Sequence, residues 1–169
     1  MSVRPLLAIA LLAGCRPMTV ELEPAALPGF SVALPPYVKV PAQLGYDEGE
    51  LDGLRDGNRV LVQWSVGPIL APGELRSTFG KALDEAMGGD PPEWDPPRSV
   101  TIAGQQASRL DGGVEGVSAV TAVDITCGGR NVVIAVAGLN TRRVRERIFE
   151  SFACTPIAAE EARLAASAR

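Results

Sequence analysis

The sequence contains no histidine, which removes the commonest general base and the commonest protein ligand of metal ions. It also lacks an excess of basic charge, because its formal net charge is −4 over 169 residues. A balance of this sign offers no surface for nucleic acid. No nucleophile stands with a base, and no phosphate-binding loop or metal-ligand motif is present, so we expect no enzyme, no metal and no cofactor. The length suits one core and one domain.

A membrane-spanning hydrophobic run is also missing. Crossing a bilayer takes roughly 20 apolar residues, whereas the apolar run from Leu6 to Ala13 has eight and ends at Gly14. A short leader with Arg4 precedes it. This layout is typical of a secretory signal peptide, which is removed after export. We therefore expect residues 1–14 to be a signal peptide.

The junction Leu12-Ala13-Gly14-Cys15 resembles the lipobox of bacterial lipoproteins. The resemblance implies that Cys15 takes up a diacylglyceryl group, becomes the first mature residue and gains a further acyl chain, and two or three chains anchor a protein stably. The alternative is an ordinary secreted protein with a chance cysteine. Arg16 stands where an aspartate often marks retention in the inner membrane, so the resemblance favours the outer membrane of the cell envelope.

Cleavage before Cys15 would remove one charge, Arg4, and leave 15 basic and 20 acidic residues, a net charge of −5. The link to the membrane would then be covalent lipid, without electrostatic help. The remaining chain divides by composition into a proline-containing tether, a folded domain and a flexible or helical tail rich in alanine, glutamate and arginine. We place these at residues 15–28, 29–156 and 157–169.

The domain alternates between strand and helix periodicity. Apolar alternation predicts strands at residues 30–34, 60–66 and 117–127, with a fully apolar strand at 132–137 in the middle of a sheet. Two helices are expected, one from Pro72 to Met87 and one over residues 141–152. Turn chemistry predicts connections at residues 47–58 and at Asp111-Gly112-Gly113. The expected fold class is α+β: a curved antiparallel sheet packed against two main helices in a single domain.

This order of elements is similar to that of the PsbP-like superfamily. The strand Gly29-Phe30-Ser31-Val32-Ala33-Leu34-Pro35 resembles the superfamily's opening strand, and the apolar strand from Val132 to Ala137 and the closing helix ending at Phe152 are similar too. The resemblance covers residues 29–155. It implies a curved antiparallel sheet carrying helices and a non-enzymatic role in binding or assembly, although a fold alone does not decide function.

Two cysteines remain once Cys15 carries lipid. Cys127 would lie at the tip of the last hairpin and Cys154 just after the last helix. An even pair in an oxidising compartment predicts a disulfide that pins this helix to the sheet. The alternative is two separate buried thiols, and the role is structural in both cases.

Two charged segments have a functional and an ordinary interpretation. The acidic residues between Asp47 and Asp56 offer oxygens to calcium but lack the EF-hand pattern, so a solvated turn is favoured. The arginines from Arg142 to Arg147 could form a partner-binding patch. Their spacing of three or four from Glu146 or Glu150 instead favours a locally paired, solvated helix face.

Trp94 stands in the proline-rich segment Asp90-Pro91-Pro92-Glu93-Trp94-Asp95-Pro96-Pro97. An aromatic residue in a stiff loop can act as a recognition point for a partner, or it can fold back over the core.

The sequence as a whole predicts a non-catalytic, lipid-anchored envelope protein that binds a protein or polymer. A small-ligand carrier with a pocket between sheet and helix is the first alternative, and a hydrolase is a weaker one.

Overall fold

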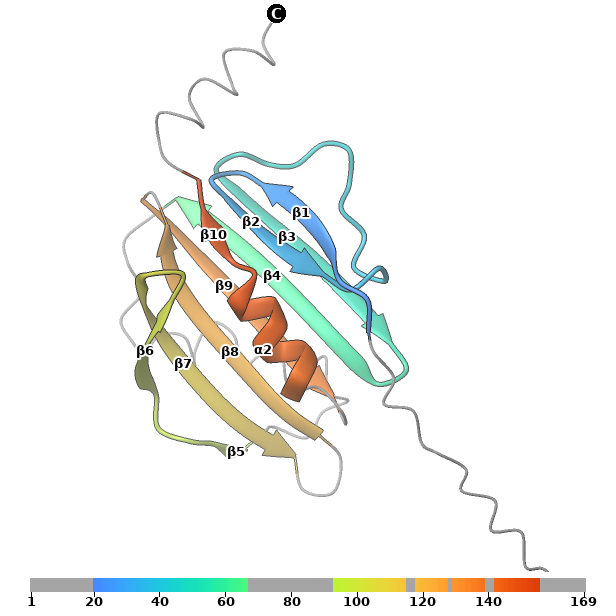
Figure 1. Ribbon diagram of the computed structural model, residues 1–169, viewed down its shortest axis with the longest axis vertical. Coiled ribbons are helices and arrows are strands. Elements are labelled where there is room, and N and C mark those ends of the chain that lie inside the picture. The colour runs from blue at the N-terminus through green and yellow to red at the C-terminus, as the bar shows by residue number, and fades with distance from the viewer. Residues whose placement is uncertain (1–19, 67–92, 115–117, 128, 139–141, 156–169) are drawn as a thin grey trace, which may run out of the picture.

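The computed structural model describes residues 20–66, 93–114, 118–127, 129–138 and 142–155. These residues form two antiparallel sheets and one helix (Figure 1). The elements are β1 (Glu23–Leu27), β2 (Phe30–Leu34), β3 (Glu48–Arg55), β4 (Asn58–Val66), β5 (Glu93–Trp94), β6 (Arg98–Ile102), β7 (Gln105–Val114), β8 (Ser118–Cys127), β9 (Arg130–Gly138), α2 (Arg142–Glu150) and β10 (Ala153–Cys154).

The larger sheet has the strand order β3-β4-β9-β8-β7-β5, with β6 also paired to β7. Strand β9 lies inside this sheet between β4 and β8, and all nine of its residues are buried. The apolar strand predicted over residues 132–137 is therefore confirmed in its central place. A tight connection joins β8 to β9, since Cys127 pairs with Arg130, and Gly129 there has a φ of 79° that favours glycine.

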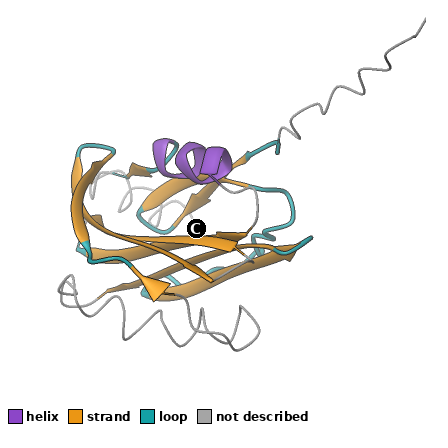
Figure 2. Cartoon of the chain, turned by 90° about the horizontal axis from the view of Figure 1, so that it is seen from below, coloured by secondary structure: helices purple, strands orange, loops and turns teal. Residues whose placement is uncertain are grey.

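The small sheet and α2 cover one face of the large sheet. The small sheet has the order β1-β2-β10, and Figure 2 shows the helix lying on one side of the long strands. The main core fills the space between these layers. At its centre the ring of Phe30 stacks on Phe152, with centroids 5.6 Å apart, and meets Trp64 edge to face at 6.0 Å.

The opposite face of the large sheet is also buried near its middle. Its apolar cluster comprises Leu61, Leu110, Val120, Ala122, Val133, Ala135 and Ala137. Because side chains alternate along a strand, residues of even number on β8 belong to this face and those of odd number belong to the face under α2. Trp94 packs against the edge of this second cluster.

The expected fold class is wrong in its balance of helix and strand. The described part of the chain is mainly β, with two sheets and one short helix, and not a single sheet packed against two main helices. Only the closing helix is seen, as α2 over residues 142–150. The helix expected from Pro72 to Met87 lies outside the described residues.

Three segments that were expected to be irregular are strands. Strand β3 runs through the acidic segment, where only Asp56 and Gly57 have the positive φ values of a turn. Strand β7 continues through Asp111-Gly112-Gly113. Strand β1 lies at residues 23–27, within the expected tether, so the ordered structure begins before Gly29. Turn-forming residues and prolines are tolerated here because β1 and β3 are edge strands with one free side.

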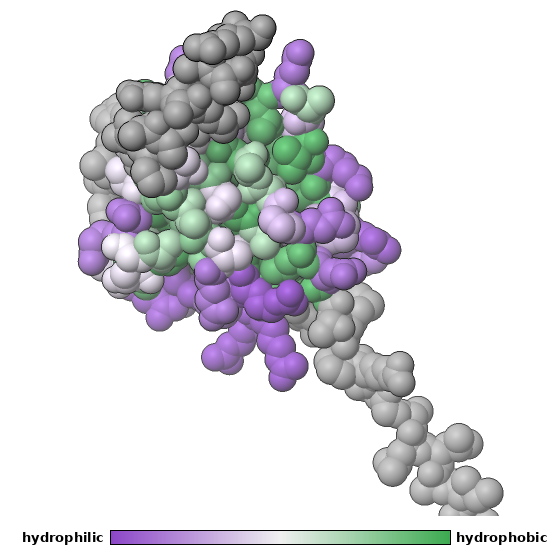
Figure 3. Space-filling view, turned by 45° about the horizontal axis from the view of Figure 1, so that its top comes forward, coloured by the Kyte–Doolittle hydropathy of each residue, from purple (hydrophilic) through white to green (hydrophobic). Residues whose placement is uncertain are grey.

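Figure 3 shows one face of the molecule, on which hydrophobic residues gather in the middle and hydrophilic side chains line the lower edge. In the described part of the chain, the large apolar side chains that stay exposed are Val40, Tyr46, Leu54 and Val66. Among the described residues, no helix combines the length and the hydrophobicity that crossing a bilayer would need.

Candidate functional site

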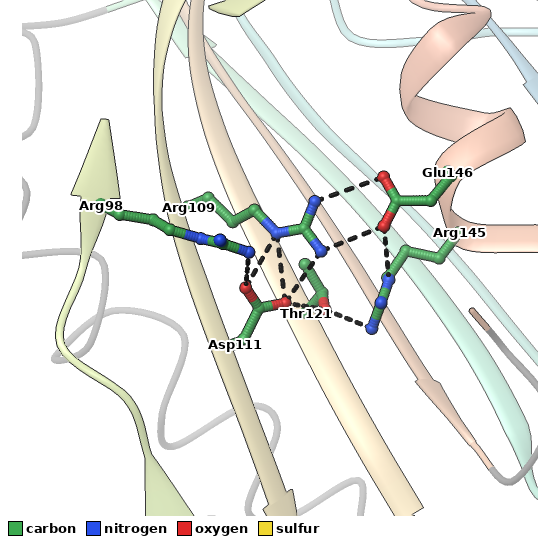
Figure 4. A network of polar contacts seen from close by, with 6 residues as sticks. All are labelled: Arg98, Arg109, Asp111, Thr121, Arg145 and Glu146. Atoms are coloured by element: carbon green, nitrogen blue, oxygen red, sulfur yellow. Dashed lines mark hydrogen bonds and ion pairs between the residues drawn. The ribbon is translucent and has the colours of Figure 1, made fainter. Parts of the chain in front are cut away.

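A network of charged side chains joins the large sheet to α2 (Figure 4). Strand β7 contributes Arg109 and Asp111, which point to the same face because they are two residues apart. Thr121 on β8 lies directly opposite Asp111 in the sheet register. The helix adds Arg145 and Glu146 from above, and Arg98 on β6 completes the network from the register position opposite Arg109.

Arg109 is the centre of this network. Its Nε donates to both carboxylate oxygens of Asp111 at 2.9 and 3.1 Å, while its Nη1 and Nη2 donate to Glu146 at 3.3 and 3.1 Å. The guanidinium carbon also lies 5.7 Å from the centre of the Phe149 ring. With only 13% of its side chain exposed, Arg109 is held rigidly between strand and helix.

Arg145 is the second buried cation of the network. Its Nη1 donates to Thr121 Oγ1 at 2.7 Å, and that hydroxyl donates onward to Asp111 at 2.6 Å. Its Nε donates to Glu146 at 3.2 Å. Arg98 reaches Asp111 from outside at 2.5 Å, and 60% of the Arg98 side chain is exposed. The network therefore has a buried part around Arg109 and Arg145 and a solvent-exposed part at Arg98.

The pKa values of Arg109, Asp111 and Glu146 are all shifted in favour of the charged form. Burial alone would raise the pKa of Asp111, but hydrogen bonds from Arg109, Thr121 and Arg98 outweigh it and lower that pKa to about 2. Burial would also raise the pKa of Glu146, but hydrogen bonds and charge from Arg109 and Arg145 lower it. The same contacts outweigh desolvation at Arg109 and raise its pKa. Asp111 and Glu146 are therefore ionised near neutral pH.

A pocket of about 560 Å³ opens beside this network, between the sheet and the start of α2. It is lined by Asp95, Pro96, Arg98, Arg109, Asp111, Gly112, Ala119, Val120, Arg142, Arg145 and Glu146. Four of these side chains are arginines and three are acids. The lining thus has one excess positive charge in a chain that is acidic as a whole. We call this feature the arginine pocket.

The wall of the arginine pocket at Asp95 and Pro96 is held by backbone contacts. Trp94 pairs with Gly112 across β5 and β7, and the Asp95 amide donates to the Asp111 carbonyl at 2.9 Å. A Cβ on Gly112 would meet the Trp94 ring at 2.8 Å, so the indole lies directly on this glycine. Trp94, for which the sequence offered either recognition of a partner or packing over the core, is half-buried at the foot of the wall.

The predicted pairing of the helix arginines differs from what the structure contains. Glu146 binds Arg109 and Arg145 rather than Arg142 or Arg143. Arg145 is consequently 11% exposed and belongs to the network, not to a solvated face. Sequence spacing could find only partners within the helix, whereas the main partner of Glu146 is 37 residues away on β7.

Two acidic side chains of β3 are hydrogen-bonded by the neighbouring strand β4. Arg59 donates to both oxygens of Asp52 at 2.6 and 2.8 Å, and Gln63 bonds to Glu50. Within the described ranges no three potential metal-ligating side chains come together. The carboxylates here stabilise the β3–β4 hairpin.

The predicted disulfide between Cys127 and Cys154 is present, with Cα atoms 5.6 Å apart. It joins the end of β8 to β10 and so ties the large sheet to the small one. The Thr155 amide donates to the Gly29 carbonyl at 2.9 Å beside it. Its role is structural. Cys15 and the rest of residues 1–19 lie outside the described residues.

One buried acid lies away from the pocket. Asp124 projects from the other face of β8, opposite Ser108 in register, and burial raises its pKa to about 6. Ser108 Oγ is buried and has no hydrogen-bond partner among the described residues. A serine and a carboxylate without a base between them do not form a nucleophilic site.

Comparison with known proteins supports the fold alone. No protein-family profile and no curated protein sequence matches the chain. Among solved structures, the chain is similar to the cyanobacterial PsbP protein CyanoP from Synechocystis sp. PCC 6803, with a TM-score of 0.56 and 16% sequence identity. The match covers 85% of this chain and 99% of CyanoP. The fold is therefore PsbP-like, as the opening and closing segments of the sequence indicated.

Proposed function

We propose that this protein is a non-catalytic accessory protein of a bacterial envelope, anchored by lipid on Cys15, which binds a protein partner at the arginine pocket. The pocket carries the proposal, because buried ion pairs hold two of its cations, Arg109 and Arg145, in place at a solvent-open site. Rigid cations of this kind lose little conformational freedom on binding. The PsbP-like fold fits such a role but does not specify it.

The chemistry of the site favours binding over catalysis. Its two central carboxyls have lowered pKa values, so neither is poised to act as a general acid or base near neutral pH. The hydroxyl that the described residues bring to the network, on Thr121, is already bonded to Asp111 and Arg145. No group in the pocket is both nucleophilic and next to a base.

The anchor rests on the leader and on the Leu12-Ala13-Gly14-Cys15 motif. Two or three acyl chains, at about 0.8 kcal/mol for each buried methylene, anchor a protein stably without basic surface charge. Arg16 after the cysteine favours the outer membrane. In this proposal the domain faces the periplasm or the exterior, where the disulfide persists.

Trp94 fits the proposal as a residue that shapes the binding wall. Its half-buried ring packs on the second apolar cluster and on Gly112, and the next two residues line the pocket. A direct contact of its exposed edge with the partner extends the same proposal.

The experiment compares the wild type with Cys15→Ala in cells of the native host. Envelope fractions are separated, and crosslinked complexes are captured with an antibody against the domain. We expect the wild type in the outer-membrane fraction with a reproducible crosslinked partner, and Cys15→Ala in the soluble fraction. Membrane sedimentation of Cys15→Ala equal to that of the wild type, or a wild type without any crosslinked partner, overturns the proposal.

A second candidate function is carriage of a small anion. It is favoured by one observation, namely that the arginine pocket lies between the sheet and α2, where a carrier would bind its ligand. A carrier would bind the anion in purified form without any protein partner. The hydrolase alternative has no group in the pocket to support it.

A further inference from the structure

We infer that the arginine pocket binds a single carboxylate of a protein partner, either an aspartate or glutamate side chain or a chain terminus. This inference rests on the proposed function and names the chemistry that the site recognises. Figure 4 shows the guanidinium groups converging between β7 and α2. Four features of the site favour a carboxylate: unused donors, the charge balance of the lining, the start of the helix and the openness of the pocket.

Three arginines have donors that no described residue uses. Arg98 bonds to Asp111 through Nη2, and no described residue accepts a hydrogen bond from its Nε or Nη1. Arg145 uses Nε and Nη1, which leaves Nη2. Arg142 is exposed at the pocket and has no hydrogen bond or ion pair with the described part of the chain. Planar guanidinium groups with free edges match the two oxygens of a carboxylate.

The charge of the lining selects a monoanion. Four guanidinium groups face three carboxylates, and the pKa of Asp111, lowered to about 2, keeps that acid ionised. One added carboxylate brings the lining to neutrality. A doubly charged phosphate would leave a net negative charge close to Asp111 and Glu146, where repulsion is strong because the site is partly buried.

The start of α2 provides a second reason for an anion. Helix N-termini favour acidic side chains, because unpaired backbone N–H groups and the helix dipole make this end positive. The first turn of α2 has no acidic residue and begins with Arg142 and Arg143. Two cations at this end oppose helix stability. A bound carboxylate beside Arg142 would relieve that repulsion.

The openness of the pocket favours an anion that projects from a larger molecule. Pockets for free small ligands enclose most of the ligand within apolar walls. Here the apolar part of the lining is limited to Pro96, Gly112, Ala119 and Val120, and the pocket is open to solvent. A side chain or terminus from a partner needs only its carboxylate held, because other contacts can form outside the pocket.

The test uses the full lipidated chain in detergent with ¹⁵N-labelled arginine, and follows the guanidinium NMR signals. The probes are a blocked pentapeptide with one central glutamate, the same peptide with glutamine, acetate and inorganic phosphate. The pocket variant is Arg98→Gln with Arg142→Gln. The matched control is Arg55→Gln with Arg143→Gln, which removes the same charge from exposed arginines outside the pocket lining.

We expect the glutamate peptide to shift the signals of Arg98 and Arg145. The affinity of the glutamine peptide should be lower by a factor of about ten or more. The affinity of the pocket variant for the glutamate peptide should fall by a similar factor, and that of the control should equal the wild-type affinity. Equal binding of the two peptides, an equal loss in the control, or no shift with either peptide overturns the inference. If phosphate binds more tightly than the glutamate peptide, the site does not select a monoanion. If acetate binds as tightly as the glutamate peptide, the carboxylate need not come from a protein.

Crosslinking in the envelope separates this inference from the function on which it rests. If the pocket variant still captures the wild-type partner, the carboxylate site is wrong and the accessory function stands. If the wild type captures no partner, the accessory function itself is wrong, whatever the peptides do.

Discussion

Arg109 and Glu146 join β7 to α2 through two hydrogen bonds of 3.1 and 3.3 Å. The same guanidinium is bonded to Asp111 on its own strand, so one cation is shared by two acids. The side chain of Arg109 is 13% exposed, against 22% for Asp111 and 40% for Glu146. The position of the helix on the sheet, and with it the shape of the arginine pocket, depends on this side chain.

Removing the central cation should destabilise the whole domain. Arg109→Gln leaves Asp111 and Glu146 half-buried without their main partner, and we expect a loss of about 2 kcal/mol in the free energy of unfolding. Urea denaturation with the disulfide intact measures this loss. Arg98→Gln is the control, since its exposed pair should contribute less than about 1 kcal/mol. Equal losses in the two variants would contradict the central role of Arg109.

Acid should weaken the fold through Asp111. Its pKa of about 2 in the folded protein lies below its ordinary value of 3.8, so the ionised group stabilises the folded state. This contribution is complete above about pH 4 and is lost as the pH falls toward the folded-state pKa. The unfolding free energy of the wild type should therefore fall more steeply in this range than that of Asp111→Asn. Parallel pH profiles of the two proteins would argue against the ion pairs.

A rise in pH should weaken the fold through Asp124. Its pKa is raised to about 6 in the folded protein, so the folded state holds its proton more tightly than the unfolded state does. Stability through this group is complete below about pH 4 and is lost as the pH rises through about 6. At pH 7, Asp124→Asn should unfold with a free energy higher by roughly 1 to 2 kcal/mol, less than the full shift implies because water screens part of the charge.

The control for this prediction is Asp56→Asn, in the exposed turn after β3, where asparagine tolerates the positive φ. It should leave both the stability at pH 7 and its pH profile unchanged. A gain in stability from Asp56→Asn as large as that from Asp124→Asn would trace the effect to net charge instead of burial.

Breaking the disulfide should loosen the small sheet first. Replacing both Cys127 and Cys154 by alanine frees a loop with a sequence separation of 27 and should lower the free energy of unfolding by about 3 kcal/mol. Hydrogen exchange of the Thr155 amide, which is bonded to the Gly29 carbonyl, should accelerate more than that of amides in β9. Uniform acceleration across both sheets would contradict a local role.

Apolar periodicity was sufficient to predict β2, β4, β8, the central β9 and the closing helix. It failed where glycine lies inside a strand for reasons of packing. A Cβ on Gly49 would come within 2.1 Å of the Trp64 ring, and Gly112 lies under Trp94 in the same way. From sequence these glycines and their acidic neighbours indicate turns, because the aromatic side chain that requires each one is distant along the chain.

The candidate site could not have been predicted in the same way. Arg109 and Asp111 lie on one face of β7, but the sequence placed Asp111 in a turn, so the pair was not recognised. Their partners Thr121 and Glu146 are set by sheet register and by the placement of α2, neither of which sequence spacing specifies. The disulfide was predictable because the expected oxidising compartment and the number of cysteines leave few alternatives.

Mass spectrometry of the protein isolated from the envelope of its native host tests the lipid anchor, on which the proposed location and function depend. We predict an N-terminal peptide that begins at Cys15, with a diacylglyceryl group on the sulfur and an acyl chain on the amine. An intact leader preceding an unmodified Cys15 thiol would contradict the proposed anchor and the envelope role built on it.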